Sequence, residues 1–298
     1  MNPQNPPHHP ENPHTSGFPI EPPHRSDDLA LAFQLAFEAG AILMDGLHRQ
    51  HSVTRKGWRD LVSETDLASE AAVTRRLERE RPDDGIHAEE SSRRMGRSGR
   101  RWVIDPLDGT TNFIHGHPMF CVSIALEAEG EGRLGVIWAP YLGELFWAEK
   151  GRGGELISIR DAPGEGHPVR RKKLCVTETD ALRDGLMATG FPYLQDERRN
   201  TNIRNFENVT LKARGIRRGG SAALDLAYVA CGRFDGFWEL YLNPWDVAAG
   251  TLLVREAGGR VTDVTGGEKW RDGWEVVATN GRLHDELSQC LSAADAQP

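Results

Sequence analysis

Two carboxylates lie three residues apart where an apolar run ends, in the stretch WVIDPLDGTTNFIHG that begins at Trp102. They are Asp105 and Asp108, and a glycine and two threonines follow at once. Because Asp, Pro, Gly and Thr are all turn formers, a plain turn is one interpretation of this stretch. The other is a chemical site that combines carboxylates, hydroxyls and permissive backbone, and the rest of the sequence has to decide between them.

Acids at the edge of an apolar element recur in four separate segments of the chain. They are Asp60 and Asp66, Glu89 and Glu90, Asp105 and Asp108, and Asp246. If these acids meet in the fold, their like charges repel one another unless a cation lies among them. Mg²⁺ favours carboxylates, water and phosphate oxygens as ligands. Unrelated caps and turns are the alternative, but a shared cation site explains the four segments together.

The residues between and after the paired aspartates suit a phosphate site. Pro106 fixes the local backbone, so that both carboxylates and the Leu107 carbonyl can converge on one region. Gly109 lets the backbone approach a ligand closely, and free N–H groups beyond it can hold an anion. Thr110 adds a hydroxyl that can orient a water molecule. Two metal ions about 3.5–4 Å apart would then stabilise both the attacking and the leaving oxygen of an in-line displacement.

The composition is that of an ordinary globular protein with an acidic balance. The 298 residues are 38% hydrophobic and 27% charged, and 36 basic against 44 acidic residues give a net charge of −8. This balance gives no support to extensive binding of nucleic acid or of an anionic membrane surface. It suits a protein that gathers carboxylates around cations, with a small molecule as its substrate.

The cysteines and the hydropathy predict a cytoplasmic protein. Four scattered cysteines have no CxxC spacing, so we expect small core residues rather than metal ligands or disulfides. They are Cys121, Cys175, Cys231 and Cys290. No uninterrupted apolar stretch approaches the ~18 residues of a membrane span, and no signal peptide opens the chain.

Residues 1–25 are rich in Pro, Asn and His and nearly free of apolar side chains, which predicts a disordered tail. Residues 26–298 are expected to form a single domain, with an α+β half to about residue 170 and an α/β half after it. Apolar periodicity and turn residues predict the elements. Helices are expected over 28–50, from near Asp66 to Pro82, and over 221–232, 244–259 and 281–291. Strands are expected over 85–91, 100–106, 234–240, 260–264 and 274–280, with an antiparallel meander over 120–150.

Two long motifs identify a resemblance. DPLDGTTNFIHG, followed later by NPWDVAAGTLLVREAGG, resembles the paired signatures of the inositol monophosphatase family. That family belongs to the lithium-sensitive, magnesium-dependent phosphatase superfamily, which also contains fructose bisphosphatases and phosphoadenosine phosphate phosphatases. DLVSETD, HAEES and RRGGSAALDLAYVACGRFDGFWEL stand in the family's order, and the match runs from about Asp28 to Leu291. The resemblance implies an α+β fold, a layered αβαβα sandwich of the sugar-phosphatase type, and usually a homodimer.

The resemblance also implies a ligand set for two or three Mg²⁺ ions in each active site. Glu89, Asp105 and the carbonyl of Leu107 would bind the first ion. Asp105, Asp108 and Asp246 would bind the second. These are the acids that the spacing argument brings together.

Further roles carry over from the family to matching positions. Thr110 and Glu89 would position the attacking water and help to deprotonate it, and Asp66 would support Thr110. The backbone of Gly109 and Thr110 would hold the phosphate. The implied substrate contacts are Gly109, Thr110, Ala222, Glu239, Asp246 and, on a mobile loop, Lys56.

The sequence departs from the family pattern in places, which leaves alternatives open. Ala88 stands where the family has Gly, and the loop from Lys56 to Asp60 is one residue short. Residues 153–173 and 200–215 also match the family poorly, and the basic run over 170–173 is interpreted as a solvated edge.

The choice of substrate rests on fewer residues. DGTTNF favours an inositol phosphate, and the carboxylate of Glu239 suits a polyol because it accepts hydrogen bonds from hydroxyls. A fructose bisphosphate or nucleotide 3′-phosphate phosphatase is the alternative within the same chemistry. A regulatory role with RNA or the transcription machinery is another, suggested by Arg214, Arg217 and Arg218.

Overall fold

The computed structural model describes residues 26–47, 49, 53–55, 61–91, 93–159, 169–192 and 201–295. The expected tail over residues 1–25 lies outside the described residues, as do Lys56 and Asp60. Helices and strands alternate along the described part of the chain. The helices are α1 Asp27–Gly46, α2 Glu64–Glu80, α3 Thr110–Ile114, α4 Ile203–Thr210, α5 Ala222–Ala230, α6 Pro244–Glu256 and α7 His284–Asp295, with 3₁₀ turns η2 Leu182–Asp184 and η3 Lys269–Asp272.

The strands form a seven-stranded, a five-stranded and a two-stranded sheet. The larger sheet is ordered β3 Gly85–Ala88, β4 Arg100–Asp108, β5 Cys121–Ala128, β6 Glu131–Ala139, β7 Glu144–Glu149, β8 Gly153–Ser158 and β9 Arg170–Lys173. The five-stranded sheet is ordered β11 Gly215–Arg217, β10 Leu186–Thr189, β12 Gly236–Leu240, β14 Glu275–Thr279 and β13 Arg260–Thr262. The strands β1 Val53–Arg55 and β2 Leu61–Ser63 pair separately. Strands β5 to β8 are the expected antiparallel meander, whereas β3 and β4 are parallel.

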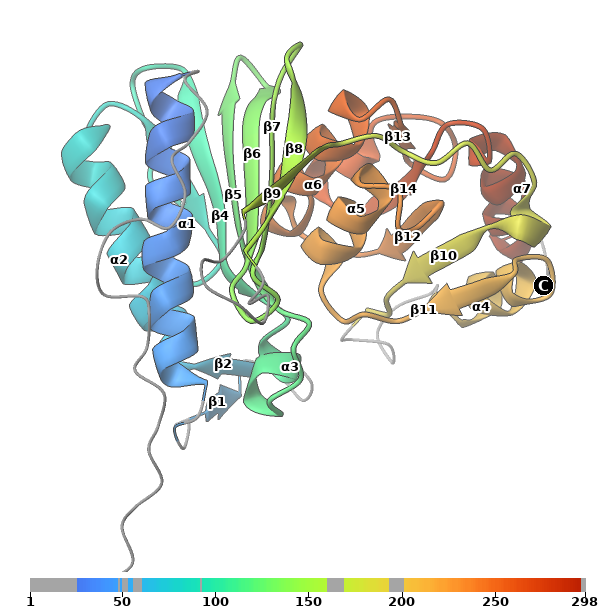
Figure 1. The fold of residues 1–298 in the computed structure, drawn as a ribbon, viewed down its shortest axis with the longest axis horizontal. Coiled ribbons are helices and arrows are strands. Elements are labelled where there is room, and N and C mark those ends of the chain that lie inside the picture. The colour runs from blue at the N-terminus through green and yellow to red at the C-terminus, as the bar shows by residue number, and fades with distance from the viewer. Residues whose placement is uncertain are drawn as a thin grey trace, which may run out of the picture.

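Five layers stack across the molecule (Figure 1). Helices α1 and α2 cover one face of the seven-stranded sheet, and α5 and α6 lie between the two sheets. Helices α4 and α7 pack together on the far side of the five-stranded sheet. Since a sheet must bury its apolar faces against another element, each sheet here is covered on both faces. The layered αβαβα sandwich predicted from the sequence is confirmed.

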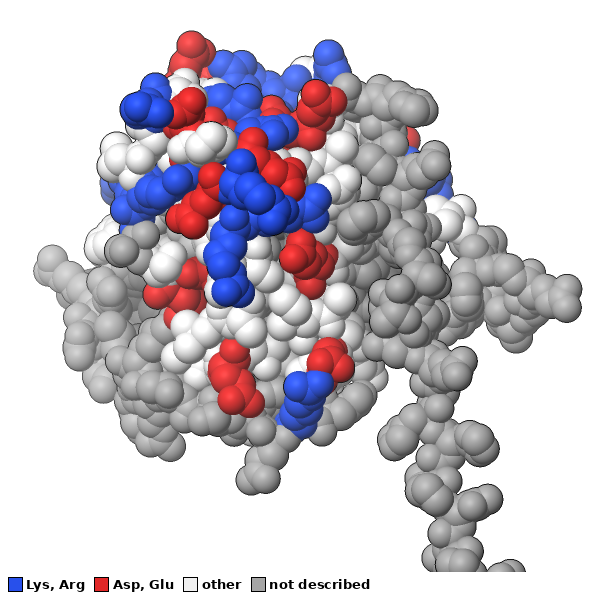
Figure 2. Space-filling view, turned by 90° about the vertical axis from the view of Figure 1, so that its left-hand side faces the viewer, with Lys and Arg blue, Asp and Glu red and all other residues white. Residues whose placement is uncertain are grey.

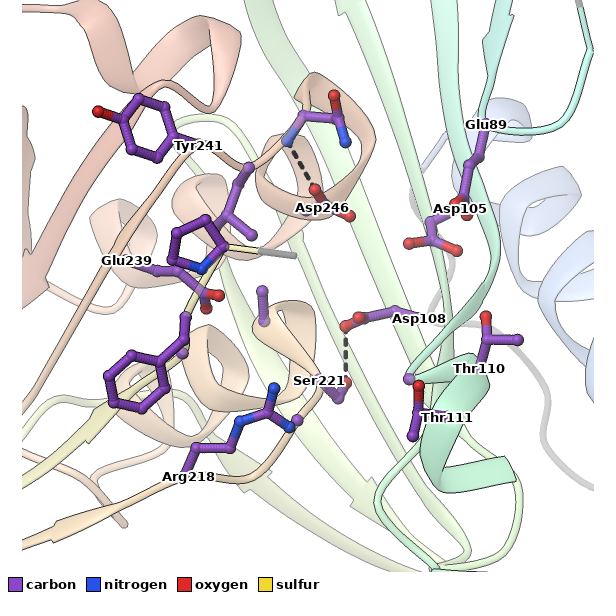
Figure 3. A pocket seen from close by; sticks show the side chains of 18 of the residues that line it. Glu89, Asp105, Asp108, Thr110, Thr111, Arg218, Ser221, Glu239, Tyr241 and Asp246 are labelled. Carbon is purple, nitrogen blue, oxygen red and sulfur yellow. Dashed lines mark hydrogen bonds between the residues drawn. The ribbon is translucent and has the colours of Figure 1, made fainter. Parts of the chain in front are cut away.

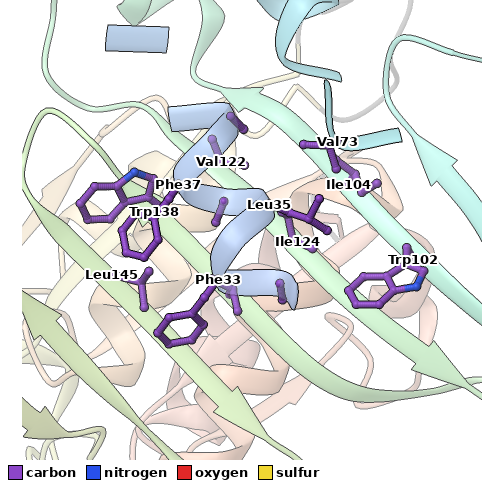
Figure 4. Packing of buried hydrophobic residues seen from close by; sticks show 14 of the residues in the cluster. Phe33, Leu35, Phe37, Val73, Trp102, Ile104, Val122, Ile124, Trp138 and Leu145 are labelled. Carbon is purple, nitrogen blue, oxygen red and sulfur yellow. The ribbon is translucent and has the colours of Figure 1, made fainter. Parts of the chain in front are cut away.

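Helix α1 follows a capping serine, Ser26, and packs its apolar side chains against the seven-stranded sheet (Figure 4). The Ser26 hydroxyl oxygen accepts a hydrogen bond from the backbone N–H of Leu29 at 3.1 Å, which satisfies a donor that the first helical turn leaves open. Phe37 meets Trp138 of β6 edge to face, with 5.0 Å between ring centroids. Gly40 permits this close approach, because a Cβ there would lie 2.3 Å from the Trp138 indole nitrogen.

By length and mean hydropathy, α1 alone among the described helices could cross a membrane. Its most apolar window is, however, 61% buried within the protein. Packing against the seven-stranded sheet therefore accounts for its apolar composition, as expected for a core helix.

The two halves of the chain share a core, which fixes the cleft between them. One cluster of buried side chains combines Ile137 of the larger sheet with Phe237 of the smaller one and Leu253 of α6. A bidentate ion pair adds a polar link: Arg233 donates to both carboxylate oxygens of Glu144 at 2.6 Å, and Glu144 is almost fully buried. Such paired, doubly hydrogen-bonded charges hold a defined geometry.

One cysteine differs from its sequence-based expectation. Cys121, Cys231 and Cys290 are buried as small core residues, but Cys175 is exposed. It lies two residues after β9, where the chain leaves the larger sheet and crosses to the second half. The prediction that all four cysteines lie in the core was wrong at this position.

The outer face formed by α2 and α1 carries interleaved charges of both signs (Figure 2). On this face Arg76 is 3.2 Å from Glu38 and 2.9 Å from Glu80. Partly exposed pairs of this kind contribute little to stability. The pairing explains why a face so rich in arginine presents no continuous basic patch.

Candidate active site

A bulge in β4 lets the paired aspartates face the same side of the sheet. In a regular strand, residues three apart point to opposite faces. Asp105 pairs with Ser123 and Asp108 with Cys121, so three residues of β4 oppose two of β5. The extra residue is what defines a β-bulge, and Pro106, which cannot donate to the ladder, lies within it. The turn formers of this stretch therefore form a bulge rather than a plain turn, and the bulge brings both carboxylates together.

Asp246, from the first turn of α6, completes a cluster with these two residues. One carboxylate oxygen each from Asp105, Asp108 and Asp246 lies within 4.8 Å of the others. All three side chains point toward a common space (Figure 3). The capping box of α6 orients the Asp246 side chain, because its carboxylate accepts a hydrogen bond from the Asn243 N–H at 2.6 Å.

Backbone and hydroxyl donors orient the other two aspartates. Asp105 accepts from the Leu107 N–H at 2.9 Å. Asp108 accepts from the Ser221 hydroxyl at 2.6 Å and from the Ala223 N–H at 2.7 Å. The two bonds of Asp108 connect the first half of the chain to the N-terminus of α5, where anions are favoured. The cluster is therefore held rigidly before any ligand binds.

The electrostatics of the cluster favour a cation. Burial, and then the charges of Glu89 and Asp108, raise the pKa of Asp105 well above its usual range. Burial and the charge of Asp108 raise the pKa of Asp246 to about 8. No Lys or Arg of the described chain forms an ion pair with Asp105, Asp108 or Asp246. Carboxylates buried together in this way are stable as anions only with a cation among them.

A hydrogen-bond chain leads from α2 into the cleft. The Thr110 hydroxyl donates to Asp66 at 3.0 Å and lies 3.2 Å from the Leu107 carbonyl oxygen. Asp66 is fully buried in the capping box of α2, where its second oxygen accepts from the backbone N–H of Ser63 at 2.9 Å and from the Ser63 hydroxyl. The direction of the Thr110 hydroxyl is thus set by a buried acceptor. Its oxygen can accept a hydrogen bond from a ligand.

Gly109 is required where β4 passes into α3. Its φ of 96° is a left-handed conformation that favours glycine. A Cβ there would lie 2.8 Å from the Met119 carbonyl oxygen. Next to it, the Asn112 amide donates to the carbonyl oxygens of Met119 at 2.6 Å and Gly219 at 2.9 Å. The amide ties this turn to the loop before α5, on the other side of the cleft.

The second half of the chain supplies the opposite wall. Glu239 of β12, Ala222 of α5 and Arg218 line the same cavity of about 110 Å³ as the aspartates. Burial, and then the charge of Asp225, raise the pKa of Glu239 to about 8, although Arg218 opposes this shift. Glu239 thus provides a buried polar group at a distance from the aspartate cluster (Figure 3).

The structure brings most of the sequence-predicted site residues to this one cleft. Those that line it are Glu89, Asp105, Leu107, Asp108, Gly109, Thr110, Ala222, Glu239 and Asp246. Asp66 lies behind Thr110 rather than in the cleft, and the predicted role of Lys56 falls outside the described residues. Sequence reasoning missed Ser221, Arg218 and Tyr241, which also line the cavity. Only Ser221 had a readable signal, as a serine directly before an apolar helix.

Comparison with known proteins gives a family for this arrangement. Residues 24–295 match the inositol monophosphatase family. An "Inositol-1-monophosphatase" of Mesorhizobium japonicum is 42% identical over 270 residues, which cover 90% of this chain and 97% of the relative. A "Nus factor SuhB" of Salmonella typhimurium is 40% identical over 274 residues, which cover 88% of this chain and 98% of the relative.

Solved structures show the same fold. The extragenic suppressor protein suhB from Bartonella henselae is 39% identical with a TM-score of 0.80, over 89% of this chain and 98% of that one. An IMPase of Thermotoga maritima is 35% identical with a TM-score of 0.79, over 91% of this chain and 98% of that one. The similarity extends over both halves of the sandwich and so includes every wall of the cleft.

Proposed function

The chain belongs to the inositol monophosphatase family and is a metal-dependent phosphoric monoester hydrolase, and we propose that it hydrolyses myo-inositol monophosphate with Mg²⁺. The observation that carries the proposal is the cluster of Asp105, Asp108 and Asp246, with ligand atoms within 4.8 Å of one another. A cytoplasmic location and a homodimer remain predictions from the sequence and the family.

Hard divalent cations fit the donor set of the cleft. The donors are carboxylate and carbonyl oxygens, as Mg²⁺ prefers. We assign one ion to Glu89, Asp105 and the Leu107 carbonyl, and a second to Asp105, Asp108 and Asp246. When bound, such ions lower the pKa of water to near neutrality and stabilise charge on a transferring phosphoryl group.

Thr110 and Glu89 are assigned to the attacking water. Because the Thr110 hydroxyl donates to Asp66 at 3.0 Å, its oxygen is left to accept from the water and to fix its position. Glu89 lines the same cavity and can take up a proton from the water. General base catalysis of this kind contributes about 10²–10⁴-fold to a rate. The Gly109 and Thr110 backbone is assigned to the phosphate.

The alcohol portion of the substrate is assigned to the wall made by Glu239 and Ala222. The oxygens of a carboxyl group accept hydrogen bonds from neighbouring hydroxyls, and Glu239 is the buried carboxyl group on the side of the cavity away from Asp105. A polyol satisfies this group, whereas an apolar alcohol would leave it without a partner. The placement supports inositol phosphate over simpler phosphate esters.

A panel of phosphate esters tests the substrate. Phosphate release with Mg²⁺ is measured for myo-inositol 1-phosphate, fructose 1,6-bisphosphate and a nucleotide 3′-phosphate under identical conditions. We expect the highest kcat/KM for the inositol ester. An Asp108→Asn variant run in parallel identifies any contaminating phosphatase. A preference for the nucleotide or for the bisphosphate would rule out inositol phosphate as the preferred substrate. The assignment as a phosphoric monoester hydrolase would still stand.

A second, regulatory function is suggested by the relatives named Nus factor SuhB. The basic cluster that suggested it does not form one surface: Arg214 is paired with Asp184 at 2.7 Å, and Arg218 lines the cleft. RNA binding by the wild-type protein and by the Asp108→Asn variant tests this role. Binding that persists without hydrolysis would establish it, and no binding by either protein would remove it.

A further inference from the structure

A groove lined by arginine lies at the opposite end of the seven-stranded sheet from the aspartate cluster. It consists of two adjoining cavities of about 180 and 280 Å³ that share Arg101, Glu127 and Gly130. The walls are the start of β4, the turn between β5 and β6, and the C-terminal half of α6. The arginines that line it, here called the arginine groove, are Arg93, Arg94, Arg100, Arg101, Arg255 and Arg271.

Carboxylates neutralise only part of this charge. Three of the arginines have acidic partners: Arg100 with Asp28 and Asp84, Arg101 with Glu127, and Arg271 with Glu268. Arg93, Arg94 and Arg255 have no carboxylate within ion-pair distance among the described residues. Two acids line the groove: Glu127 is paired with Arg101, and Asp272 has no basic partner among the described residues. On the outer face of α1 and α2, in contrast, Arg76 and Arg79 have acidic partners, and charges of both signs are interleaved (Figure 2).

A further observation points to a ligand. The Nη2 of Arg94 donates to the backbone carbonyl oxygen of Asp84 at 2.7 Å. Its Nε is buried and has no hydrogen-bond partner in the described structure, although a buried donor without a partner is costly. The groove thus gathers six arginines, one with a buried and unsatisfied nitrogen, in a protein whose net charge is −8.

The groove is separate from the active site. Arg101 and Asp105 lie four residues apart on β4, which corresponds to about 13 Å of strand. Asp246 and Arg255 lie nine residues apart on α6, or about 14 Å of helix. No residue lines both the aspartate cavity and the arginine groove. A ligand in the groove would contact α6 without occupying the cleft.

We propose that the arginine groove binds a small polyphosphate anion, such as the triphosphate of a nucleotide or a free polyphosphate. Guanidinium groups bind phosphate oxygens through paired, charge-assisted hydrogen bonds. Several unpaired guanidinium groups around one groove suit a ligand with several phosphates rather than one. The proposal does not depend on the assigned substrate, because the groove lies outside the catalytic cleft.

Isothermal titration of the full chain in excess EDTA tests the proposal. Without metal the active-site acids repel anions, so binding reports the groove. Tripolyphosphate is the first probe and ATP the second, and we expect saturable one-to-one binding of tripolyphosphate. Equal affinity for ATP means that phosphates alone are recognised, and higher affinity means that the nucleoside also makes contact. Both results support the groove.

Matched double variants locate the binding. Arg93→Gln/Arg255→Gln removes two unpaired charges from the groove and should weaken binding about 10-fold or more. Arg183→Gln/Arg282→Gln removes two charges from exposed arginines elsewhere and should change it less than about 2-fold. Melting curves check that both variants fold. No saturable binding by the wild type, or equal weakening in both variants, would overturn the proposal. An RNA oligonucleotide that binds over tenfold more tightly than tripolyphosphate would overturn the small-ligand assignment.

Discussion

The two ends of α6 present opposite unbalanced charges. At its N-terminus Asp246 meets Asp105 and Asp108, and no basic side chain of the described chain pairs with them. At its C-terminus Arg255 lines the arginine groove, where it too has no carboxylate partner among described residues. The helix dipole favours this order, with acid at the N-terminus and base at the C-terminus, but only by about 0.3–1 kcal/mol for each charge.

The two ends of α6 differ in burial, so their unpaired charges affect the stability of the metal-free protein differently. Asp105 and Asp108 are nearly fully buried, so their mutual repulsion is weakly screened and destabilises the metal-free fold. Arg255 is exposed, and water screens its charge. We infer that the acidic end is kept for the cations it binds, since it costs stability without them. The basic end lowers stability little, so stability measurements do not reveal its function and anion-binding measurements are needed.

The largest expected effect is at the acidic end. Asp105→Asn should lower kcat/KM by about 10³ or more, because it removes a ligand that both assigned ions share. The metal-free variant should be at least as stable as the wild type, since one buried like charge is gone.

Asp225→Asn is the control, because Asp225 is a buried carboxyl outside the proposed ligand set. It should lose less than about tenfold in kcat/KM, which lies below the loss typical of a group that acts in the transition state. Equal inactivation of both variants would mean that burial of acid, rather than ligation by Asp105, explains the effect.

Thr110→Val should follow, with a loss of about 100-fold in kcat and little change in KM. The change removes the hydroxyl that Asp66 orients and keeps the shape of the side chain. Thr111→Val is matched to it, because Thr111 lines the same cavity and is the next residue in the chain. Steady-state kinetics with saturating Mg²⁺ should show a clearly smaller loss for Thr111→Val. Similar losses would refute a special role for the bond between Thr110 and Asp66.

The pH dependence of stability should show the unbalanced charge directly. The folded-state pKa values of Asp246 and Glu239 are raised to about 8, so the folded protein keeps protons that the unfolded chain has released. The stability of the metal-free protein should therefore fall as pH rises toward 8. Between pH ~6.5 and ~8 we expect a loss of about 3 kcal/mol from the two groups together, measured by urea unfolding in EDTA.

His284 is the reason for measuring above pH ~6.5. Burial lowers the pKa of His284 to about 4, so its contribution to the free energy of unfolding increases with pH between about 4 and 6.5. In that range it opposes the loss of stability caused by the acids. Above pH ~6.5 the imidazole is neutral in both states. Saturating Mg²⁺ should reduce or reverse the slope, because metal binds the deprotonated acids. A slope that Asp246→Asn leaves unchanged would assign the titration to other groups.

Parts of this architecture were readable in the sequence and others were not. The helix from Asp27 and the bulged motif at Asp105 are local: a cap, a period and a short spacing define them. Strands β10 and β11 have four and three residues, too short for a period, and pair with segments far away along the chain. Arg218 was noted only as part of a basic run, because its position in the cleft depends on where α5 docks. The arginine groove has no sequence signature, since its walls come from three distant segments.

The smallest expected effect concerns the basic end and could break the comparison. Arg255 lies over the Trp270 ring with 5.8 Å between the guanidinium carbon and the centroid, and it occupies the last turn of α6. Cation–π and dipole contributions at an exposed site are each below about 1 kcal/mol. Arg255→Gln should therefore lower the free energy of unfolding by less than about 2 kcal/mol, measured by urea unfolding. Arg233→Gln is the contrasting variant: it removes the guanidinium that donates to both oxygens of the buried Glu144 carboxylate, which costs about 3–5 kcal/mol. If Arg255→Gln approached that cost, Arg255 would be a structural cation, and stability rather than a bound anion would explain why positive charge is kept at this end of α6.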